Sequence, residues 1–182
     1  MIPADSVVAA GVFSDELFGV ADPSAIIGIQ FSFPSAWTQA RGPNIDLRDI
    51  RTTDGAFLLA TPLPAGTTLD KLPTSFFTDT LFAAGGKYGM YGTVDDYRVL
   101  SSVVEEVDGI RYRTLEIKFA ALSFNYNSVE RRLLLRAAVV GRGVYLLAAS
   151  ALANRYPTAS PQLRGICESF RVRSIRTARA AR

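Results

Sequence analysis

The chain has 182 residues, of which 48% are apolar and 20% charged, and its formal net charge is +3. This length fits one domain that buries about two thirds of the surface exposed by its unfolded chain, so no disulfide is needed for stability. Histidine is absent and Cys167 is the single cysteine. Ser-His-Asp and Cys-His catalysis, cysteine-based zinc sites and intramolecular disulfides are therefore excluded.

The charge is unevenly distributed along the chain. Residues 1–30 carry four acidic residues and no basic one, whereas residues 171–182 carry five arginines and no acidic residue. We interpret both ends as docking segments, with ordinary solvated termini as the alternative. The basic end is too short and too poor in aromatic residues to indicate nucleic acid binding.

No apolar run in the sequence reaches the ~18 to 20 residues that span a bilayer, so we expect no transmembrane segment. The first residues also lack the basic start of a signal peptide, and earlier removal of a presequence stays open.

Residues 1–28 lack sustained periodicity and are expected to form an extended arm. The next stretch, "IIGIQFSF", alternates from Ile27 to Phe33 between apolar residues and small or polar ones, which predicts a strand that Pro34 ends. Trp37 follows and is interpreted as packing over the turn where the chain enters the fold. A sugar-stacking platform and a catalytic loop are the alternatives for this stretch.

A hairpin and a helix are predicted next. The hairpin spans residues 45–61 and turns at Asp54-Gly55, where glycine takes a positive φ easily. The helix spans residues 74–84, with Thr74 or Ser75 as its N-cap and Gly85-Gly86 as its stop.

Two further hairpins follow. The first turns at Asp108-Gly109, and a shift in its apolar pattern predicts a β-bulge or a sheet edge between Tyr112 and Leu115. The second joins "RRLLLRAAVV" to "VYLLAAS" through "GRG" and is the most apolar part of the chain. We expect its two strands at the centre of the sheet, covered on both faces.

The chain ends with an amphipathic helix. Ser160 is the expected N-cap, and Cys167 lies on the apolar face with Leu163, Ile166 and Phe170. The order of elements predicts an α+β domain, with helices packed against an antiparallel sheet.

The carboxylates give weak indications of chemistry. Asp95 and Asp96 are adjacent, so their side chains point in different directions and do not form the facing pair that acid-base catalysis needs. A carboxylate-dependent metal hydrolase using Asp95, Asp96 and Asp108 is therefore the minor alternative.

The stretch "GGKYGMYG" is glycine-rich but lacks the spacing of a phosphate-binding loop, so it is interpreted as a mobile loop. Arg131, Arg132 and Arg136 are interpreted as the rim of the sheet. The adjacent pair Arg131 and Arg132 is a candidate for contact with an acidic partner.

In this order of elements the chain resembles the PsbP family of photosynthetic lumenal proteins, over about residues 29–172. The similarity rests on five stretches in the same order: "FSFPSAW", "GGKYGMYGT", "VDGIRY", "GRGVYLLAA" and "CESFRV". Many members carry a basic residue followed by histidine before the last hairpin. This chain has Arg131-Arg132 there, which argues against a histidine-based metal site.

The resemblance implies an α/β/α sandwich, in which helices flank a central antiparallel sheet, and no enzymatic activity. It also implies an extrinsic subunit in the chloroplast thylakoid lumen, which supports the oxygen-evolving complex of photosystem II in retaining calcium and chloride and binds no cofactor itself. A subunit or assembly factor of photosystem I is the alternative.

The resemblance further implies three parts: a docking arm at residues 1–28, a domain at residues 29–172 and a basic tail at residues 173–182. The family's arm docks on the photosystem, but this one is acidic and has no Lys or Arg. The candidate docking residues are Val12, Phe13, Asp15, Glu16, Leu17, Phe18, Arg131, Arg132, Arg171, Arg173, Arg176 and Arg179.

Overall fold

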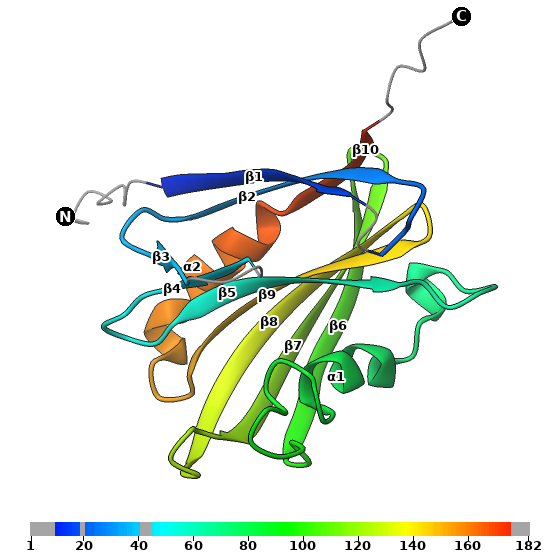
Figure 1. Cartoon of the computed structure of the whole chain (residues 1–182). Coiled ribbons are helices and arrows are strands. Elements are labelled where there is room, and N and C mark those ends of the chain that lie inside the picture. Colours follow the sequence, from blue (N-terminus) through cyan, green and yellow to red (C-terminus); the bar gives the residue numbers. More distant parts are fainter. Residues whose placement is uncertain (1–9, 19–20, 41–44, 176–182) are drawn as a thin grey trace, which may run out of the picture.

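The computed structural model describes residues 10–18, 21–40 and 45–175, and Figure 1 shows a molecule built mainly of strands with two α-helices. The elements in chain order are β1 (Ala10–Phe18), β2 (Ile26–Pro34), β3 (Thr38–Gln39), β4 (Asp46–Arg48), β5 (Gly55–Pro62), the 3-10 helix η1 (Leu69–Lys71), α1 (Thr74–Phe82), β6 (Tyr97–Val107), β7 (Ile110–Leu122), β8 (Ser128–Val140), β9 (Gly143–Leu152), α2 (Tyr156–Glu168) and β10 (Arg171–Ile175).

Seven strands form one antiparallel sheet in the order β3-β4-β5-β9-β8-β7-β6. The apolar β8–β9 hairpin lies inside this sheet, as predicted, and nearly every residue of β9 is buried. Both strands are apolar on both sides because both faces of the sheet are covered. Strand β6 lies at an edge and is almost entirely exposed.

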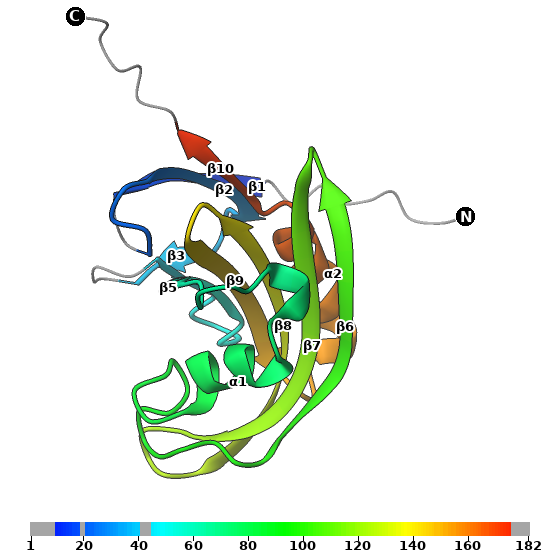
Figure 2. The same cartoon turned by 90° about the vertical axis from the view of Figure 1, so that its right-hand side faces the viewer.

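The two faces of the large sheet carry different layers (Figure 2). Helix α1 and η1 pack on one face, around Phe77, Leu81 and Leu135. Helix α2 packs on the other face, together with a second sheet that contributes Ile29 and Phe31. The chain is thus mixed α and β. The expected sandwich of helices around one sheet is not confirmed, because a sheet supplies much of one outer layer.

The second sheet has the order β1-β2-β10. Strand β1 lies inside the segment that we expected to be an arm, and β10 extends into the expected basic tail. The division into arm, domain and tail stays a prediction, but parts of both ends pair with the same strand, β2.

Several local predictions are confirmed. Strand β2 ends at Pro34, and Trp37 is buried after a turn in which its backbone N–H donates to the Pro34 carbonyl at 2.9 Å. Asp108 and Gly109 form the β6–β7 turn with φ values of 53° and 76°. Positive φ at both positions matches the right-handed twist of the flanking strands.

Other local predictions are wrong. The β4–β5 connection takes its positive φ at Thr53 (61°), and Gly55 already belongs to β5. The bulge lies in β6, between Val99 and Ser101, where the expected site was in β7. In both cases the tertiary pairing of the strands decides the position, and the local pattern does not.

The helix starts also differ from the prediction. Helix α1 has Pro73 at its N-cap position, with no side-chain cap from Thr74 or Ser75. Helix α2 begins one turn before the predicted cap Ser160 and continues through Pro161. Pro161 removes one backbone donor, but burial of Ala159 and Leu163 on either side of it holds the helix in place.

Candidate docking surface and polar network

The first candidate site is the β1-β2-β10 sheet, which we call the docking sheet. Its register places Ser14, Gln30 and Arg171 in one row across the three strands, and Glu16, Gly28 and Arg173 in another. Strand β1 from the acidic segment and β10 from the basic segment thus pair with opposite edges of β2. The sequence indicated two separate docking segments, and the fold joins them into one surface.

The docking sheet and the tip of the β6–β7 hairpin, which lie beside each other in Figures 1 and 2, enclose a groove of about 340 Å³. Arg171 lies 3.9 Å from Asp108 of the hairpin. Its guanidinium also donates to the carbonyls of Glu168 and Phe170, at 2.7 and 2.9 Å. The residues that line the groove are Ser14, Asp15, Gly28, Ile29, Gln30, Val107, Asp108, Ile110, Tyr112, Arg171, Val172, Arg173 and Ile175.

Two contacts shape this groove. The Tyr112 hydroxyl accepts a hydrogen bond from the backbone N–H of Val172 at 3.1 Å, which ties β10 to β7. Gly28 leaves room for the Arg173 side chain, because a Cβ at this position would lie 3.2 Å from Arg173 Nε and 3.3 Å from its Cγ. Because residue 28 has no side chain, Arg173 can lie across the surface of the sheet at this position.

The candidate docking residues of the arm are placed differently from one another. Val12 is exposed, whereas the Phe13 ring stacks on Phe31 with centroids 5.1 Å apart and packs against the core. Asp15 is exposed and lines the groove. Glu16, Leu17 and Phe18 belong to β1, but their side chains are outside the described part, as are Arg176 and Arg179. A docking role for all of these residues stays a prediction.

The arginines of β8 make contacts within the chain. Arg132 pairs with Glu116, and its guanidinium lies over the Tyr156 ring at 4.7 Å. Arg136 was expected at the rim but is 2% exposed, pairs with Glu105 and lies 4.5 Å from the Tyr112 ring. This placement corrects the expectation for Arg136, because its position in β8 lies inside the seven-stranded sheet.

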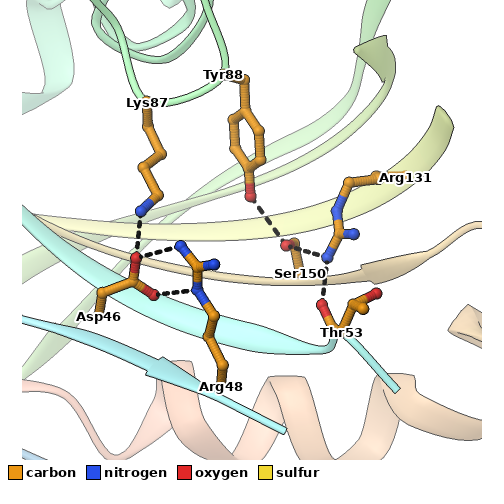
Figure 3. A network of polar contacts seen from close by, with 7 residues as sticks. All are labelled: Asp46, Arg48, Thr53, Lys87, Tyr88, Arg131 and Ser150. Atoms are coloured by element: carbon orange, nitrogen blue, oxygen red, sulfur yellow. Dashed lines mark hydrogen bonds and ion pairs between the residues drawn. The ribbon is translucent and has the colours of Figure 1, made fainter. Parts of the chain in front are cut away.

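The second candidate site is a buried polar network beneath the glycine-rich loop, shown in Figure 3. Its centre is Asp46, whose side chain is 10% exposed. Arg48 donates to both Asp46 carboxylate oxygens, at 3.1 and 2.8 Å, and Lys87 of the loop forms an ion pair with the same carboxylate. Asp46 thereby connects β4 to the segment after α1.

Tyr88 makes the second connection between the loop and the sheet. Its hydroxyl lies 2.9 Å from Ser150 Oγ, which also receives a hydrogen bond from Arg131 at 3.0 Å. Arg131 donates to the Thr53 carbonyl as well, at 2.9 Å, and therefore also joins the β4–β5 connection to the network (Figure 3). The guanidinium of the candidate docking residue Arg131, which is partly exposed, is thus engaged by partners within the chain.

Close packing fixes the same loop. The Tyr88 ring lies 4.6 Å from the Phe119 ring, between centroids. A Cβ on Gly89 would lie 2.0 Å from the Ala83 carbonyl oxygen, so only glycine fits there. The expected mobile loop is therefore packed on the sheet at Lys87 to Gly89. The sequence did not indicate this, because Asp46 and Ser150 are distant along the chain.

The network determines the ionisation of Asp46. Burial alone would raise the pKa of its carboxyl, but hydrogen bonds from Arg48 and Lys87 outweigh burial and lower the pKa below its ordinary value. In the same way, Arg132 outweighs burial at Glu116 and lowers the pKa of that carboxyl. Both groups stay ionised as partners of arginine or lysine, which suits a structural role.

The structure also places Cys167 and the three aspartates that the sequence offered for metal chemistry. Burial raises the pKa of the Cys167 thiol to about 12, and this side chain faces the core as predicted. Asp95 and Asp96 precede β6, while Asp108 follows it. The 11 residues of β6 separate them, by about 35 Å for an extended strand. The structure therefore does not support the metal hydrolase alternative.

The described residues lack two features. They contain no cluster of three or more Asp, Glu, Cys or His side chains arranged to hold a metal ion. They also contain no helix of the length and apolarity that crossing a membrane requires.

Comparison with solved structures shows related folds. The solution structure of cyanobacterial PsbP (CyanoP) from Synechocystis sp. PCC 6803 matches with a TM-score of 0.60 and 16% identity, covering 95% of this chain and 98% of that one. The Ran-binding protein Mog1p of Saccharomyces cerevisiae matches with a TM-score of 0.56 and 10% identity, covering 90% and 96%. Identities this low show a shared fold alone.

Comparison with sequences gives the family. No curated protein matches the chain. The family model for PsbP matches residues 24–172, which is most of the chain. This span includes β2 to β9, both helices and the start of β10, and it contains the glycine-rich loop and the network that holds it. The chain therefore belongs to the PsbP family.

Proposed function

We propose that this protein is a non-catalytic extrinsic subunit of photosystem II. In this role it docks on lumenal parts of the membrane subunits and helps the oxygen-evolving complex to retain calcium and chloride, without binding a cofactor itself. The observation that carries the proposal is the match to the PsbP family over residues 24–172. The proposed location is the chloroplast thylakoid lumen, on the surface of the membrane.

The docking sheet supports this proposal because it presents charges of both signs on one side of the domain. Arg173 is exposed and Arg171 has a side-chain exposure of 41%, and both line the groove with Asp15 and Asp108. Partly exposed charges steer association and select partners without a large cost of desolvation.

The polar network supports the non-catalytic part of the proposal. Asp46, Lys87 and Arg131 have the residue types of an active site, but each is paired within the chain. Charges held by internal partners stabilise one arrangement of loop and sheet. A rigid scaffold that presents a docking sheet fits a subunit that shields a site on another protein.

The alternative is association with photosystem I, as a subunit or an assembly factor. It rests on the same family match, because the acidic N-terminal segment, with no Lys or Arg in residues 1–28, does not separate the two photosystems. This segment differs in charge from the docking arm of the family, so the surface that the segment contacts must be basic or apolar. Fractionation of thylakoid membranes distinguishes the two photosystems as partners.

The test is co-purification from thylakoid membranes, followed by native gel separation and cross-linking through residues 1–28 and 171–182. We expect the protein in the photosystem II fractions, cross-linked to lumenal subunits and released by a high-salt wash. Recovery with photosystem I would establish the alternative. A protein that cofractionates with neither photosystem, before or after the salt wash, would refute both.

A matched pair of variants sharpens this test. Arg173→Ser removes an exposed charge from the docking sheet, whereas Arg51→Ser removes one of 77% exposure from the β4–β5 connection. We expect the first variant to bind the photosystem several-fold more weakly and the second to bind as the unchanged protein does. Equal binding by all three would exclude the docking sheet as the contact.

A further inference from the structure

Five large side chains are exposed together at the end of the molecule where the α1–β6 and β7–β8 connections lie. We call this group the aromatic tip, and its exposed fractions are 70% for Met90, 42% for Tyr91, 39% for Leu122, 70% for Phe124 and 71% for Tyr126. The two connections lie side by side at the lower end of Figures 1 and 2. Contiguous exposed apolar side chains on a small domain indicate an interaction site.

Contacts between the two connections make the aromatic tip one surface. The rings of Tyr91 and Tyr126 meet edge to face, with centroids 6.4 Å apart. A Cβ on Gly92 would lie 3.5 Å from Leu122 Cδ1. Behind the tip, Lys87 and Tyr88 fix the α1–β6 connection to the sheet. The exposed side chains are therefore presented by a fixed base.

The backbone at Tyr126 shows that the turn itself does not require an aromatic residue. Tyr126 has a φ of 58°, in the left-handed region that favours glycine or asparagine and is unfavourable for a bulky side chain. Asparagine flanks it on both sides, at Asn125 and Asn127. The fold would be served as well or better by a small residue at position 126, so the exposed ring points to a role outside the fold.

The charge pattern indicates what this surface contacts. No charged residue occurs in residues 88–94 or in residues 119–129. The charges that directly flank these segments are Lys87, Asp95, Lys118 and Glu130, which sum to zero, and Lys87 is paired with Asp46. An anionic lipid surface or nucleic acid would select lysine and arginine here. An uncharged surface with an apolar interior fits better.

We propose that the aromatic tip inserts into the interface of a membrane whose lipid head groups carry no net charge. Tyrosine and phenylalanine side chains have a high affinity for the boundary between head groups and acyl chains. The tip consists of two neighbouring loop ends, and insertion to the depth of one side chain leaves both sheets in water. This inference concerns the lipid itself and holds whichever photosystem the protein serves.

The first experiment is flotation of the full chain with vesicles of phosphatidylcholine alone, comparing the unchanged protein with the variant Phe124→Ser/Tyr126→Gly. We expect the unchanged protein to float with the vesicles and the variant to bind at least about tenfold more weakly, because transfer of one phenylalanine side chain out of water is worth that factor. Ile50→Ser is the matched control, since Ile50 is 81% exposed on the β4–β5 connection.

Folding of the variant is checked by its thermal midpoint, which we expect to be unchanged or higher because glycine adopts the φ of residue 126 without strain. Insertion itself is checked with Phe124→Trp, whose fluorescence should shift to the blue with vesicles and be quenched by brominated lipid. Trp37 is 5% exposed and gives a constant background, and Ile50→Trp is the control.

Three outcomes would overturn the proposal. The first is failure of the unchanged protein to float with phosphatidylcholine vesicles. This outcome includes the case in which the tip binds a membrane protein and not the lipid. The second is floating that requires anionic phosphatidylglycerol and disappears in salt, which would assign binding to the basic tail. The third is equal floating of the unchanged protein and the Phe124→Ser/Tyr126→Gly variant.

Discussion

The polar network and the docking sheet both contain arginine and aspartate, but they hold these residues in opposite ways. In the network, the Asp46 side chain is 10% exposed and has two cationic partners at hydrogen-bonding distance. On the docking sheet, Arg171 is 41% exposed and its carboxylate partner Asp108 is 85% exposed and 3.9 Å away. The same residue types therefore stabilise the fold in one region and remain available to a partner in the other.

Burial explains the difference. In the network the carboxylate is the buried member, so removing it deprives Lys87, which is 26% exposed, of its partner, whereas Arg48 is 56% exposed and can be hydrated. The loss still exceeds what a fully exposed pair contributes. Partly exposed charges lose little when their neighbour is removed, but they contribute to the rate and specificity of association. Variants in the two regions should thus separate stability from docking.

The largest effect is expected for Asp46→Ala. It removes the carboxylate that Lys87 and the more exposed Arg48 share, so we expect a loss of about 1.5–3 kcal/mol in the free energy of unfolding, measured by urea denaturation. The control is Asp95→Ala, at an exposed position, with a change below about 0.5 kcal/mol. An equally small change for Asp46→Ala would show that the network does not hold the loop.

The dependence of the free energy of unfolding on pH should reveal the ionisation of the Asp46 carboxylate. The pKa of Asp46 is lowered in the folded protein from its ordinary value of 3.8. The contribution of the ionised Asp46 carboxylate to the free energy of unfolding is thus complete above pH 3.8. It is lost as the pH falls through the pKa that Asp46 has in the folded protein.

We expect the unchanged protein to lose more stability than Asp46→Asn below the ordinary pKa of Asp46, by up to about 1.4 kcal/mol per pH unit. Urea denaturation at a series of acidic pH values measures this difference. The contribution of Glu116 to the pH dependence is the same in both proteins, so it cancels in the difference between them. Parallel curves for the two proteins would contradict the lowered pKa.

A smaller effect is expected for Tyr88→Phe. The variant keeps the ring packed on Phe119 but loses the hydroxyl that contacts Ser150, so the free energy of unfolding should fall by about 1 kcal/mol. Limited proteolysis in the α1–β6 connection should be faster in the same variant. Tyr126→Phe, at an exposed tyrosine, is the control and should change neither quantity.

The smallest effect on stability is expected for Arg173→Ser, on the docking sheet. Because this arginine is exposed, the free energy of unfolding should change by less than about 0.5 kcal/mol. Binding to photosystem particles should nevertheless weaken, and more so at low ionic strength, where charge steering is strongest. A large loss of stability would show that Arg173 has a structural role, as the charges of the polar network do.

Much of the fold follows from local patterns. The alternation from Ile27 to Phe33, the Asp108-Gly109 turn and the apolar β8–β9 hairpin are confirmed as elements. These features are predictable because periodic burial and turn geometry depend on neighbouring residues. Element ends were less predictable, as the early start of α2 shows, because packing of Tyr156 and Ala159 overrides the local cap signal.

The candidate sites depended on contacts that the sequence does not contain. The sequence singled out "GGKYGMYG" and Arg131, but it predicted a mobile loop and did not indicate the partners of Arg131 within the chain. Asp46, Lys87 and Ser150 come from β4, the α1–β6 connection and β9, and only the order of strands in the sheet brings them together. Long-range pairs of this kind carry no local signal.

By itself, the sequence determined the chemical limits of this protein and its family. The absence of histidine excludes the commonest catalytic arrangements, and five ordered motifs indicated the family that the match over residues 24–172 establishes. The tertiary structure alone decided that β1 and β10 flank β2, that Arg136 is buried and that Arg131 is bonded to Thr53 and Ser150. Composition and motifs are local properties, whereas burial and pairing depend on which distant strands become neighbours.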